Sequence, residues 1–396
     1  YGQTRFLKKK NLIHISIELM SKIKIITVVG TRPEIIRLSS IIKKLESNFN
    51  HVLINTNQNY NKNLNSIFFK DFQIKNPKYN INTKSKTTIE TISKIINKVD
   101  KIIEKEKPDA FLVLGDTNSC LSSYSAKRRK VPIFHLEAGN RCFDENVPEE
   151  INRKIVDNIS DINLTYSLNS KLNLLNEGFK IDTLFEVGSP LCEVIKDNFD
   201  KIEKSNILKK ILIPKKKYII ASIHREENVD DEKKLFKIFD ILSSIITKTK
   251  YKVIFTLHPR TKKMIIKNKI KPHKDIKFFD PFNFFDYCFL QKNSKFVISD
   301  SGSISEESVI LNFPAINLRN SHERSEAMDS GAVIMTGINQ TSVMQSIKVM
   351  ENQNFLGPND RNIRIKSYEQ KNVSDKVVGI INSYYHSIKE NKWLNN

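Results

Sequence analysis

The chain has 396 residues, of which 39% are hydrophobic and 28% charged, and this length predicts about two globular domains of roughly 100 to 200 residues each. Its 65 Lys and Arg against 44 Asp and Glu give a formal charge of +21, which favours an anionic partner such as nucleic acid, an anionic membrane or a phosphorylated substrate. The lysines are scattered, as in "IIKNKIKPHKDIKFF", without the aromatic pattern of RNA-binding modules, and the four cysteines form no Cys-x-x-Cys pair. Solvated lysines, no zinc site and a reducing compartment are therefore expected.

The first segment, "YGQTRFLKKKNLIHISIELM", is a poor signal peptide, because His14 and Glu18 interrupt its apolar part and it lacks a small-residue cleavage site. Met20 has the character of a natural start, so we expect residues 1–19 to be a non-native or disordered extension. No apolar run approaches the roughly 18 residues of a membrane span. We expect no membrane insertion and a cytoplasmic location.

Short apolar runs alternate with helical stretches from residue 22 onward. The predicted strands are "KIKIITVVG", "HVLINT", "AFLVLGD", "VPIFHLEA" and "DINLTYS". The predicted helices between them are "PEIIRLSSIIKKLES", "TTIETISKIINKVDKIIEKE", "SCLSSYSAKRRK" and "PEEINRKIVDNIS", which carry apolar residues at three- and four-residue spacing. This alternation indicates a parallel sheet covered by helices.

A second series follows the Lys-rich connector "KIEKSNILKKILIPKKK". Its predicted strands are "YIIASIH", "KVIFTLH", "IKFFD", "KFVISDS" and "PAINLR", and its clearest helix is "DEKKLFKIFDILSSIITK". The fold class is therefore α/β with two doubly wound domains. We place the N-terminal domain at residues 20–190, the C-terminal domain at 191–370, and a C-terminal helix at 371–396 that packs back on the N-terminal domain.

Polar clusters stand at the carboxyl ends of the predicted strands, where such sheets bind ligands. They are "GTRPE", "GDTNS", "EAGNRCFDENVPEE", "HREEN", "HPR", "SDSGSISEES" and "RNSHERSEA". The absence of a G-x-G-x-x-G or Walker sequence argues against NAD and ATP chemistry. One cleft between two facing domains is expected to collect these clusters.

Taken singly, each cluster has a structural and a functional interpretation. Ser301 and Gly302 precede a predicted helix start, which suits a phosphate or an ordinary N-cap. Asp116 is either a catalytic acid or base or the N-cap of a helix from Ser119. Glu149 and Arg153 are four residues apart and share one helical face. They are either a surface ion pair or part of a functional site.

The same ambiguity holds for three further residues. Arg32 is either a diphosphate ligand or a surface arginine. His224 either faces the first domain's carboxylates or is structural. Glu137 ends an apolar strand and needs a compensating cation, from Arg141 or elsewhere, to stay ionised.

In combination, "GTRPE", "GDT", "H-x-EAG", "PEE-x-NR", "HREEN", "DSG-x-x-x-EE" and "HER-x-E" closely resemble the non-hydrolysing UDP-N-acetylglucosamine 2-epimerase family, over nearly all of the chain beyond residue 21. The resemblance implies two facing Rossmann-like domains of the glycosyltransferase GT-B type with a nucleotide sugar in the cleft. It implies no metal, no redox cofactor and a homodimer. The reaction is inversion at C2, in which UDP leaves C1 as the C2 proton is removed, and UDP adds back as a proton arrives on the opposite face.

The matching motifs imply residue roles. The acid/base set is Asp116, Glu137 and Glu149, with His224 assisting near the leaving diphosphate. Substrate binding falls to Arg32, Arg153, His258, Ser301, Gly302, Glu307 and Arg324. Two proton-handling groups on opposite faces are what the chemistry requires.

Several segments of this sequence differ from the commoner family motifs, and these differences indicate one branch of the family. "NRCFDENVPEE", "SGSISEE" and "HERSE" replace the usual forms, and the chain looks most like the enzymes that convert UDP-2-acetamido-2,6-dideoxy-L-talose to UDP-N-acetyl-L-fucosamine for bacterial capsule or O-antigen polysaccharide. Phe143 is a candidate contact for the 6-methyl group. "TNQNY" lacks the usual glycine and histidine, which argues against regulation by a second nucleotide sugar.

Four alternative interpretations of the sequence remain open. The altered loop is also compatible with sequence drift that never touches the sugar. The enzymatic alternatives are a UDP-N-acetylglucosamine 2-epimerase that makes UDP-N-acetylmannosamine and a hydrolysing 2-epimerase. The non-enzymatic alternative is a basic protein that binds RNA or anionic lipid.

Overall fold

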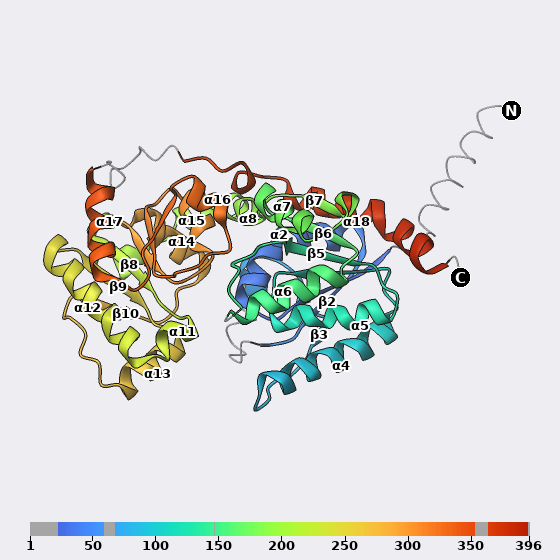
Figure 1. Ribbon diagram of the computed structural model, residues 1–396, viewed down its shortest axis with the longest axis horizontal. Helices are drawn as coiled ribbons and strands as arrows, with labels where there is room; N and C mark the ends of the chain where they lie inside the picture. The colour runs from blue at the N-terminus through green and yellow to red at the C-terminus, as the bar shows by residue number, and fades with distance from the viewer. Residues whose placement is uncertain (1–22, 59–67, 146, 353–362, 395–396) are drawn as a thin grey trace. The chain divides into compact units, whose positions relative to one another are not determined.

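The protein consists of two parallel-sheet α/β domains with the GT-B type of fold, drawn in Figure 1. The structure, a computed structural model, describes residues 23–58, 68–145, 147–352 and 363–394. The expected extension at 1–19 and the last two residues of "TNQNY" lie outside the described residues.

The strands form one seven-stranded and one six-stranded sheet. The first sheet contains β1 (Lys24–Val29), β2 (Asn50–Asn55), β3 (Tyr79–Asn80), β4 (Ala110–Leu114), β5 (Ile133–Ala138), β6 (Ile162–Thr165) and β7 (Leu184–Glu186). The second contains β8 (Tyr218–Ser222), β9 (Lys252–Thr256), β10 (Ile276–Phe279), β11 (Val297–Ser299), β12 (Ala315–Asn317) and β13 (Val333–Met335).

Helices connect these strands. Up to the start of the second sheet they are α2 (Arg32–Asn48), α4 (Thr88–Glu106), α5 (Ser123–Arg128), α6 (Pro148–Ile159), α7 (Leu168–Asn176), α8 (Leu191–Asp197), α9 (Phe199–Glu203) and α10 (Ile207–Lys210). They continue with α11 (Glu226–Val229), α12 (Glu232–Thr249), α13 (Pro259–Lys267), α14 (Phe284–Asn293), α15 (Ile304–Ile310), α16 (Ser325–Asp329), α17 (Gln340–Asn352) and α18 (Val373–Lys389). Short 3₁₀ turns are η1 (Asn118–Ser122), η2 (Ile181–Thr183) and η3 (Lys366–Tyr368), and the π-helical turn η4 (Glu390–Leu394) follows α18.

The two sheets share one strand order. The first runs β3-β2-β1-β4-β5-β6-β7 and the second β10-β9-β8-β11-β12-β13, so each reverses direction at one point, between β1 and β4 and between β8 and β11. In doubly wound sheets a ligand binds beyond the carboxyl ends of the strands at this switch point. The residues after β1, β4, β8 and β11 therefore define where a site is expected in each sheet.

By internal contacts the chain divides into two compact units. Unit 1 contains residues 1–138, 151–164 and 374–396, and unit 2 contains residues 139–150 and 165–373. The division does not follow the sheets, because β7 belongs to the first sheet while its residues lie in unit 2.

Apolar strands and helix faces form a separate core in each unit. In unit 1, Ile26 and Val28 of β1 are fully buried and pack with Ile95 and Val99 of α4. The amphipathic spacing of α4 directs these isoleucine and valine side chains inward, and Figure 1 shows α4 beside α5. In unit 2 the corresponding core lies between β8, β9 and α12, which contributes Ile238 and Leu242.

The C-terminal helix α18 belongs to unit 1, although almost the whole of unit 2 precedes it in the chain. Lys44 of α2 pairs with Asp375 at 2.8 Å, and Lys389 pairs with Asp109 at 2.7 Å. Just beyond the helix, Lys392 pairs with the buried Asp161, also at 2.7 Å. These ion pairs link the end of the chain to the first sheet. No helix among the described residues is long and apolar enough to cross a membrane.

Candidate active site

The switch point of the first sheet brings two of the predicted carboxylates to one arginine. Asp116 follows β4 and Glu137 lies near the end of β5, and the fully buried Arg153 of α6 contacts both. Its Nη2 donates to Asp116 Oδ2, and its Nη1 lies 3.5 Å from Glu137 Oε1. The guanidinium thus offsets the mutual repulsion of two carboxylates.

Helix α6 also holds the backbone around these carboxylates. Asn152 Nδ2 donates to the carbonyl of Asp116 at 2.9 Å, and Arg153 Nη1 donates to the carbonyl of Glu137 at 3.1 Å. Glu137 has a φ of 68°, in the left-handed region that a non-glycine residue rarely adopts. Backbone strain of this kind clusters at functional sites and persists where the surroundings fix it.

The capping alternative for Asp116 is wrong. The N-cap of η1 is Thr117, whose side chain accepts from the amide of Ser119 at 3.2 Å. The carboxylate of Asp116 therefore does not cap this helix and contacts Arg153 instead.

A buried carboxylate organises the loop after β1. Glu34 forms a capping box with Thr31 at the start of α2, accepts from the amide of Gly30 at 3.0 Å, and accepts from Thr117 Oγ1 at 2.9 Å. Burial raises the pKa of Glu34, although these hydrogen bonds oppose the shift. Gly30 is required here, because a Cβ would come within 2.1 Å of Ser119 Oγ. The loops carrying Arg32 and Asp116 are thus joined through Glu34.

Arg32, the predicted diphosphate ligand, is the first residue of α2. Its guanidinium carbon lies 4.9 Å from the centre of the Phe68 ring, a cation–π distance. Stacking fixes the side chain while leaving its in-plane N–H groups able to donate.

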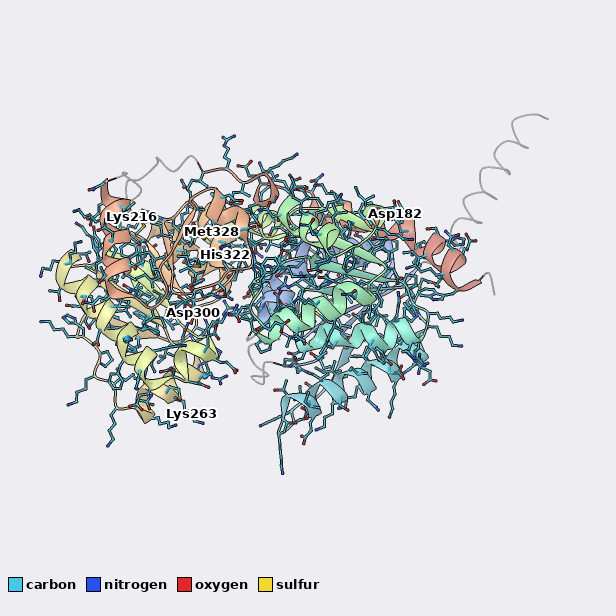
Figure 2. The ribbon with its side chains drawn as sticks, viewed as in Figure 1. Asp182, Lys216, Lys263, Asp300, His322 and Met328 are labelled. Atoms are coloured by element: carbon cyan, nitrogen blue, oxygen red, sulfur yellow. The ribbon has the colours of Figure 1, made fainter. Side chains whose placement is uncertain are left out.

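In unit 2, the predicted histidines lie at the switch point of the second sheet. His224 follows β8, and its Nδ1 lies 3.3 Å from the Oδ1 atom of Asp300. Asp300 is labelled in Figure 2. Asp300 is fully buried after β11 and also accepts from the backbone amides of His224 and Arg225. The ring of His258, after β9, lies 6.2 Å from that of His224, and burial together with His224 and Arg260 lowers its pKa.

The turn after β11 leads into α15, which begins at Ile304 as predicted. Ser301 Oγ and Ser303 Oγ are 2.9 Å apart, and Ser303 Oγ donates to Glu307 Oε1 at 2.8 Å. The second oxygen of Glu307 accepts from Gln291 Nε2 at 2.6 Å. The hydroxyls and Glu307 therefore form one connected polar surface at the start of the helix.

Charged side chains surround this turn. Arg324 Nη1 donates to the carbonyl of Gly302 at 3.3 Å, and its Nε lies 2.7 Å from the buried Glu306. A Cβ at Gly302 would lie 3.2 Å from Arg324 Nη1 and 3.3 Å from Glu323 Oε2, so glycine allows the close packing. Arg324, a predicted substrate-binding residue, thus contacts the turn that carries Gly302.

Two contacts that the sequence did not reveal hold described residues between β5 and the first turn of α6. The side chain of Arg141 is fully buried and holds Glu177 through two contacts of 2.7 Å. Glu150 accepts from the amide of Cys142 at 3.0 Å. Glu149 remains 43% exposed, with Arg225 Nη1 at 3.9 Å.

Arg225, Asp300 and Asn152 are therefore functional candidates that sequence reasoning did not single out. The sequence contains a signal for Asp300, because this residue ends an apolar strand immediately before Ser301. Arg225 and Asn152 stand beside named motif residues, but their partners are distant in the chain.

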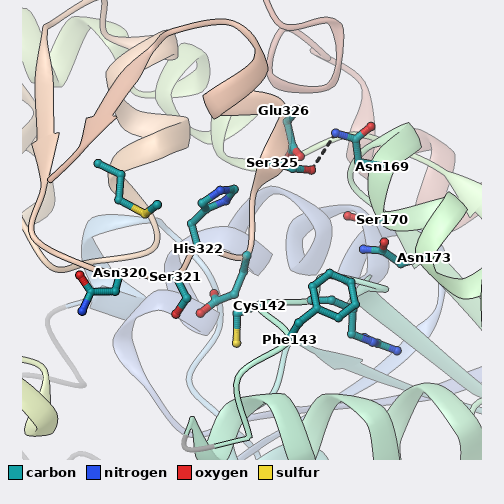
Figure 3. A pocket seen from close by; sticks show the side chains of 13 residues that line it. Cys142, Phe143, Asn169, Ser170, Asn173, Asn320, Ser321, His322, Ser325 and Glu326 are labelled. Carbon is teal, nitrogen blue, oxygen red and sulfur yellow. Dashed lines mark hydrogen bonds between the residues drawn. The ribbon is translucent and has the colours of Figure 1, made fainter. Parts of the chain in front are cut away.

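A cavity of about 290 Å³ lies within unit 2 (Figure 3). Two segments that depart from the commoner family pattern line it, namely Arg141–Phe143 and Asn320–Glu323 with Ser325 and Glu326. Asn169, Ser170, Asn173 and Met335 complete the lining. Asn169 Nδ2 donates to Ser325 Oγ at 2.8 Å across this lining.

The cavity combines amides and hydroxyls with two large apolar side chains. Phe143 is 76% exposed and Met335 is 36% exposed. Burial, followed by the charge of Arg319, lowers the pKa of His322, so a neutral imidazole faces the cavity. Such a lining suits a polar ligand that also carries apolar groups.

Among the described residues, no group of three or more His, Cys, Asp or Glu side chains is arranged to hold a metal ion. The carboxylates at the first switch point have an arginine as their shared cation.

Comparison with known proteins decides the family. The model of the UDP-N-acetylglucosamine 2-epimerase family matches residues 43–382. The chain belongs to this family. Its relatives are named as UDP-sugar 2-epimerases, so the chain is an isomerase.

Three relatives illustrate the similarity. The structure of the Rickettsia bellii UDP-N-acetylglucosamine 2-epimerase is 40% identical with a TM-score of 0.86, covering 94% of this chain and 100% of that one. The Methanocaldococcus jannaschii UDP-GlcNAc 2-epimerase, solved in complex with UDP-GlcNAc and UDP, is 35% identical with a TM-score of 0.85, covering 91% and 100%. The Pseudomonas aeruginosa UDP-2,3-diacetamido-2,3-dideoxy-D-glucuronate 2-epimerase is 30% identical, covering 88% of this chain and 99% of its own length.

Proposed function

We propose that this protein inverts C2 of a UDP-linked N-acetyl sugar through a glycal. The C2 proton passes to a carboxylate while the C1–O bond to UDP breaks, and UDP then re-forms that bond as a second group protonates the opposite face of C2. The observation that carries the proposal is the arrangement of Asp116 and Glu137 around the buried Arg153 at a switch point. Proton abstraction and return require two carboxylates held in fixed positions.

The proposed roles follow the positions of the side chains. Asp116, Glu137 and Glu149 handle protons, and His224, oriented by Asp300, assists departure of the diphosphate. The substrate-binding set is Arg32, Arg153, His258, Ser301, Gly302, Glu307 and Arg324, in which Arg324 acts by fixing the turn at Gly302.

Turnover in heavy water tests the mechanism. The glycal route exchanges the C2 proton with solvent, so recovered substrate and product should both carry deuterium at C2, which mass spectrometry and proton NMR detect. Complete retention of protium at C2 during turnover would reject the glycal route.

The finer proposal concerns the sugar. We propose UDP-2-acetamido-2,6-dideoxy-L-talose as substrate and UDP-N-acetyl-L-fucosamine, a precursor of bacterial surface polysaccharide, as product. The support is that the two departing segments line one cavity, where Phe143 and Met335 offer apolar contact to a 6-methyl group. The names of the relatives show that the accepted sugar varies within the family.

Product analysis with a panel of UDP-sugars tests this assignment. We expect kcat/KM to be about a hundredfold higher for the 6-deoxy-L-talose substrate than for UDP-N-acetylglucosamine, the usual limit when an apolar pocket must reject an added hydroxyl. Equal or better efficiency on UDP-N-acetylglucosamine would make that sugar the substrate and leave the C2 chemistry intact. Release of free sugar and UDP would instead favour a hydrolysing enzyme.

We also propose that the enzyme acts as a cytoplasmic homodimer. Ile151 and Ile155, one turn apart on α6, are 49% and 45% exposed, so this helix presents apolar side chains at its surface. Light scattering should then give a molar mass about twice the 45.9 kDa of the chain.

A further inference from the structure

A buried histidine–aspartate pair adjoins the segment that carries Asp116. His135 of β5 and Asp157 of α6 are both fully buried. The Nδ1 atom of His135 lies 2.8 Å from Asp157 Oδ1, and its Nε2 lies 2.7 Å from the carbonyl oxygen of Gly115. Neither residue belongs to the acid/base or substrate-binding sets proposed above.

The two contacts fix how many hydrogens the pair holds. A carbonyl oxygen only accepts, so Nε2 must carry a hydrogen and donate to Gly115. The contact between Nδ1 and Asp157 requires one more hydrogen between those two groups. His135 therefore donates to Gly115 whether the pair is imidazolium and carboxylate or a neutral imidazole and carboxylic acid.

The acceptor is the peptide group immediately before Asp116. Gly115 has a φ of 77°, which glycine adopts without strain, and its amide donates to the carbonyl of Leu136 at 2.8 Å. His135 holds the other side of the same residue, and Asn152 and Arg153 hold the carbonyl and carboxylate of Asp116. Helix α6 thus reaches this segment through Asn152, Arg153 and Asp157.

We infer that His135, oriented by Asp157, is a positioning residue that sets the direction of the Asp116 carboxylate through the Gly115 carbonyl. This inference rests on the proposed role of Asp116 as a proton-handling group. Proton transfer requires the carboxylate to lie within hydrogen-bonding reach of the C2 proton. A rotated Gly115 peptide turns the carboxylate away while leaving the side chains that bind UDP in place.

Two substitutions of His135 separate the two hydrogen bonds. In His135→Asn, the amide nitrogen takes the place of Nδ1 and keeps the contact to Asp157, but nothing donates to Gly115. In His135→Gln the amide nitrogen takes the place of Nε2 and keeps the bond to Gly115. The glutamine variant is combined with Asp157→Asn, so that no unpaired carboxylate remains buried.

The matched control is Asp161→Asn. Asp161 is equally buried, accepts from the amide of Ile133 at 2.9 Å at the start of β5, and pairs with Lys127 at 2.6 Å. Its loss weakens the same strand far from Asp116, so the melting temperature should fall while kcat stays near the wild-type value.

We expect His135→Asn to lower kcat by about 10- to 100-fold, the effect of a misplaced catalytic group, with the KM of the UDP-sugar and the thermal shift caused by UDP unchanged. The combined His135→Gln and Asp157→Asn variant should retain a larger share of kcat than His135→Asn. Equal loss of kcat in both, or loss only in proportion to the melting temperature as in Asp161→Asn, would reduce the pair to a structural role and overturn the inference.

Hydrogen exchange of the peptide covering residues 112–118, without any substrate, gives a readout that does not depend on the reaction. Exchange should accelerate in His135→Asn and stay near the wild-type rate in the combined variant, and unchanged exchange in His135→Asn would contradict the inference. If the wild-type protein fails to epimerise every UDP-sugar in the panel, the proposed function fails, while the exchange comparison still decides whether His135 fixes the Gly115 peptide.

Discussion

At the end of β5, Glu137 combines a positive φ, near-complete burial and contact with Arg153. A strained glutamate is unfavourable for folding, so its presence at the switch point is best explained by the direction it gives the carboxylate. Arg153 holds both the carbonyl and the carboxylate of this residue. One arginine therefore serves both the geometry and the electrostatics of Glu137.

Replacing the carboxylates tests their roles one at a time. Asp116→Asn, Glu137→Gln and Glu149→Gln should each lower kcat by about two to four powers of ten, the scale of a lost acid or base. Steady-state kinetics on the preferred UDP-sugar measures the effect. The matched control is Glu203→Gln, which weakens an exposed pair with Lys292 and removes no proposed proton carrier. Wild-type turnover in Glu137→Gln would remove that residue from the mechanism.

At the scale of elements, α4 is tied to β1 and β3 by one carboxylate. Glu106, the last residue of α4, is 6% exposed and accepts from Lys24, Lys78 and Tyr79. Burial alone would raise the pKa of Glu106, but the hydrogen bonds from Lys78, Tyr79 and Lys24 outweigh it and lower the pKa to about 2. The ionised carboxylate therefore stabilises the fold.

This shift predicts a pH dependence of stability. The folded pKa of about 2 lies below the ordinary glutamate value of 4.5, so the stabilisation is fully present above pH 4.5 and is lost as the pH falls towards 2. Glu106→Gln should lower the free energy of unfolding at pH 7 by roughly 3 kcal/mol and flatten its decline between those pH values. Denaturant unfolding at a series of pH values measures this.

Asp100→Asn on the same helix is the control for Glu106. Asp100 pairs with Arg129 at 2.6 Å but is 37% exposed, and exposed pairs contribute little to stability. If both substitutions lowered the free energy of unfolding equally, the burial of Glu106 and its several hydrogen-bond donors would not contribute to stability.

The limits of sequence prediction are also clearest among the elements. Ten of the strands correspond to predicted apolar runs, whereas β3, β7 and β13 were not predicted. These three have two or three residues each and lie at sheet edges, where no long buried run is needed. Apolar runs therefore predicted the interior strands and the edge strand β10, whereas pairing partners determined the three short edge strands.

The candidate site was also only partly predictable from the sequence. The motifs at the strand ends predicted that Asp116, Glu137 and His224 lie near the carboxyl ends of strands, because these positions follow from parallel-sheet topology. The sequence did not reveal that Arg141 binds Glu177, 36 residues away, or that Arg324 faces Glu306 and the Gly302 carbonyl. Such contacts depend on how helices pack after folding and leave no periodic signal.

At the scale of the whole molecule, both sheets have the same strand order, and each carries part of the proposed machinery at its switch point. In the first sheet Asp116 follows β4 and Glu137 lies near the end of β5, while the polar turn at Ser301–Ser303 follows β11 in the second. Proton transfer and nucleotide binding are thus assigned to different sheets. Nucleotide binding is consequently testable without any chemistry.

UDP binding should stabilise the whole chain, and Gly302 should determine how much. A ligand at about 100 times its dissociation constant adds about 2.7 kcal/mol, so millimolar UDP should raise the melting temperature. In Gly302→Ala the new Cβ meets Arg324 and Glu323 at 3.2 and 3.3 Å, which displaces the turn and should shrink the shift. Gly379→Ala is the matched control, since nothing lies within 4 Å of its Cβ, and it should keep the full shift. Thermal unfolding with and without UDP measures all three proteins, and an undiminished shift in Gly302→Ala would exclude this turn from nucleotide binding.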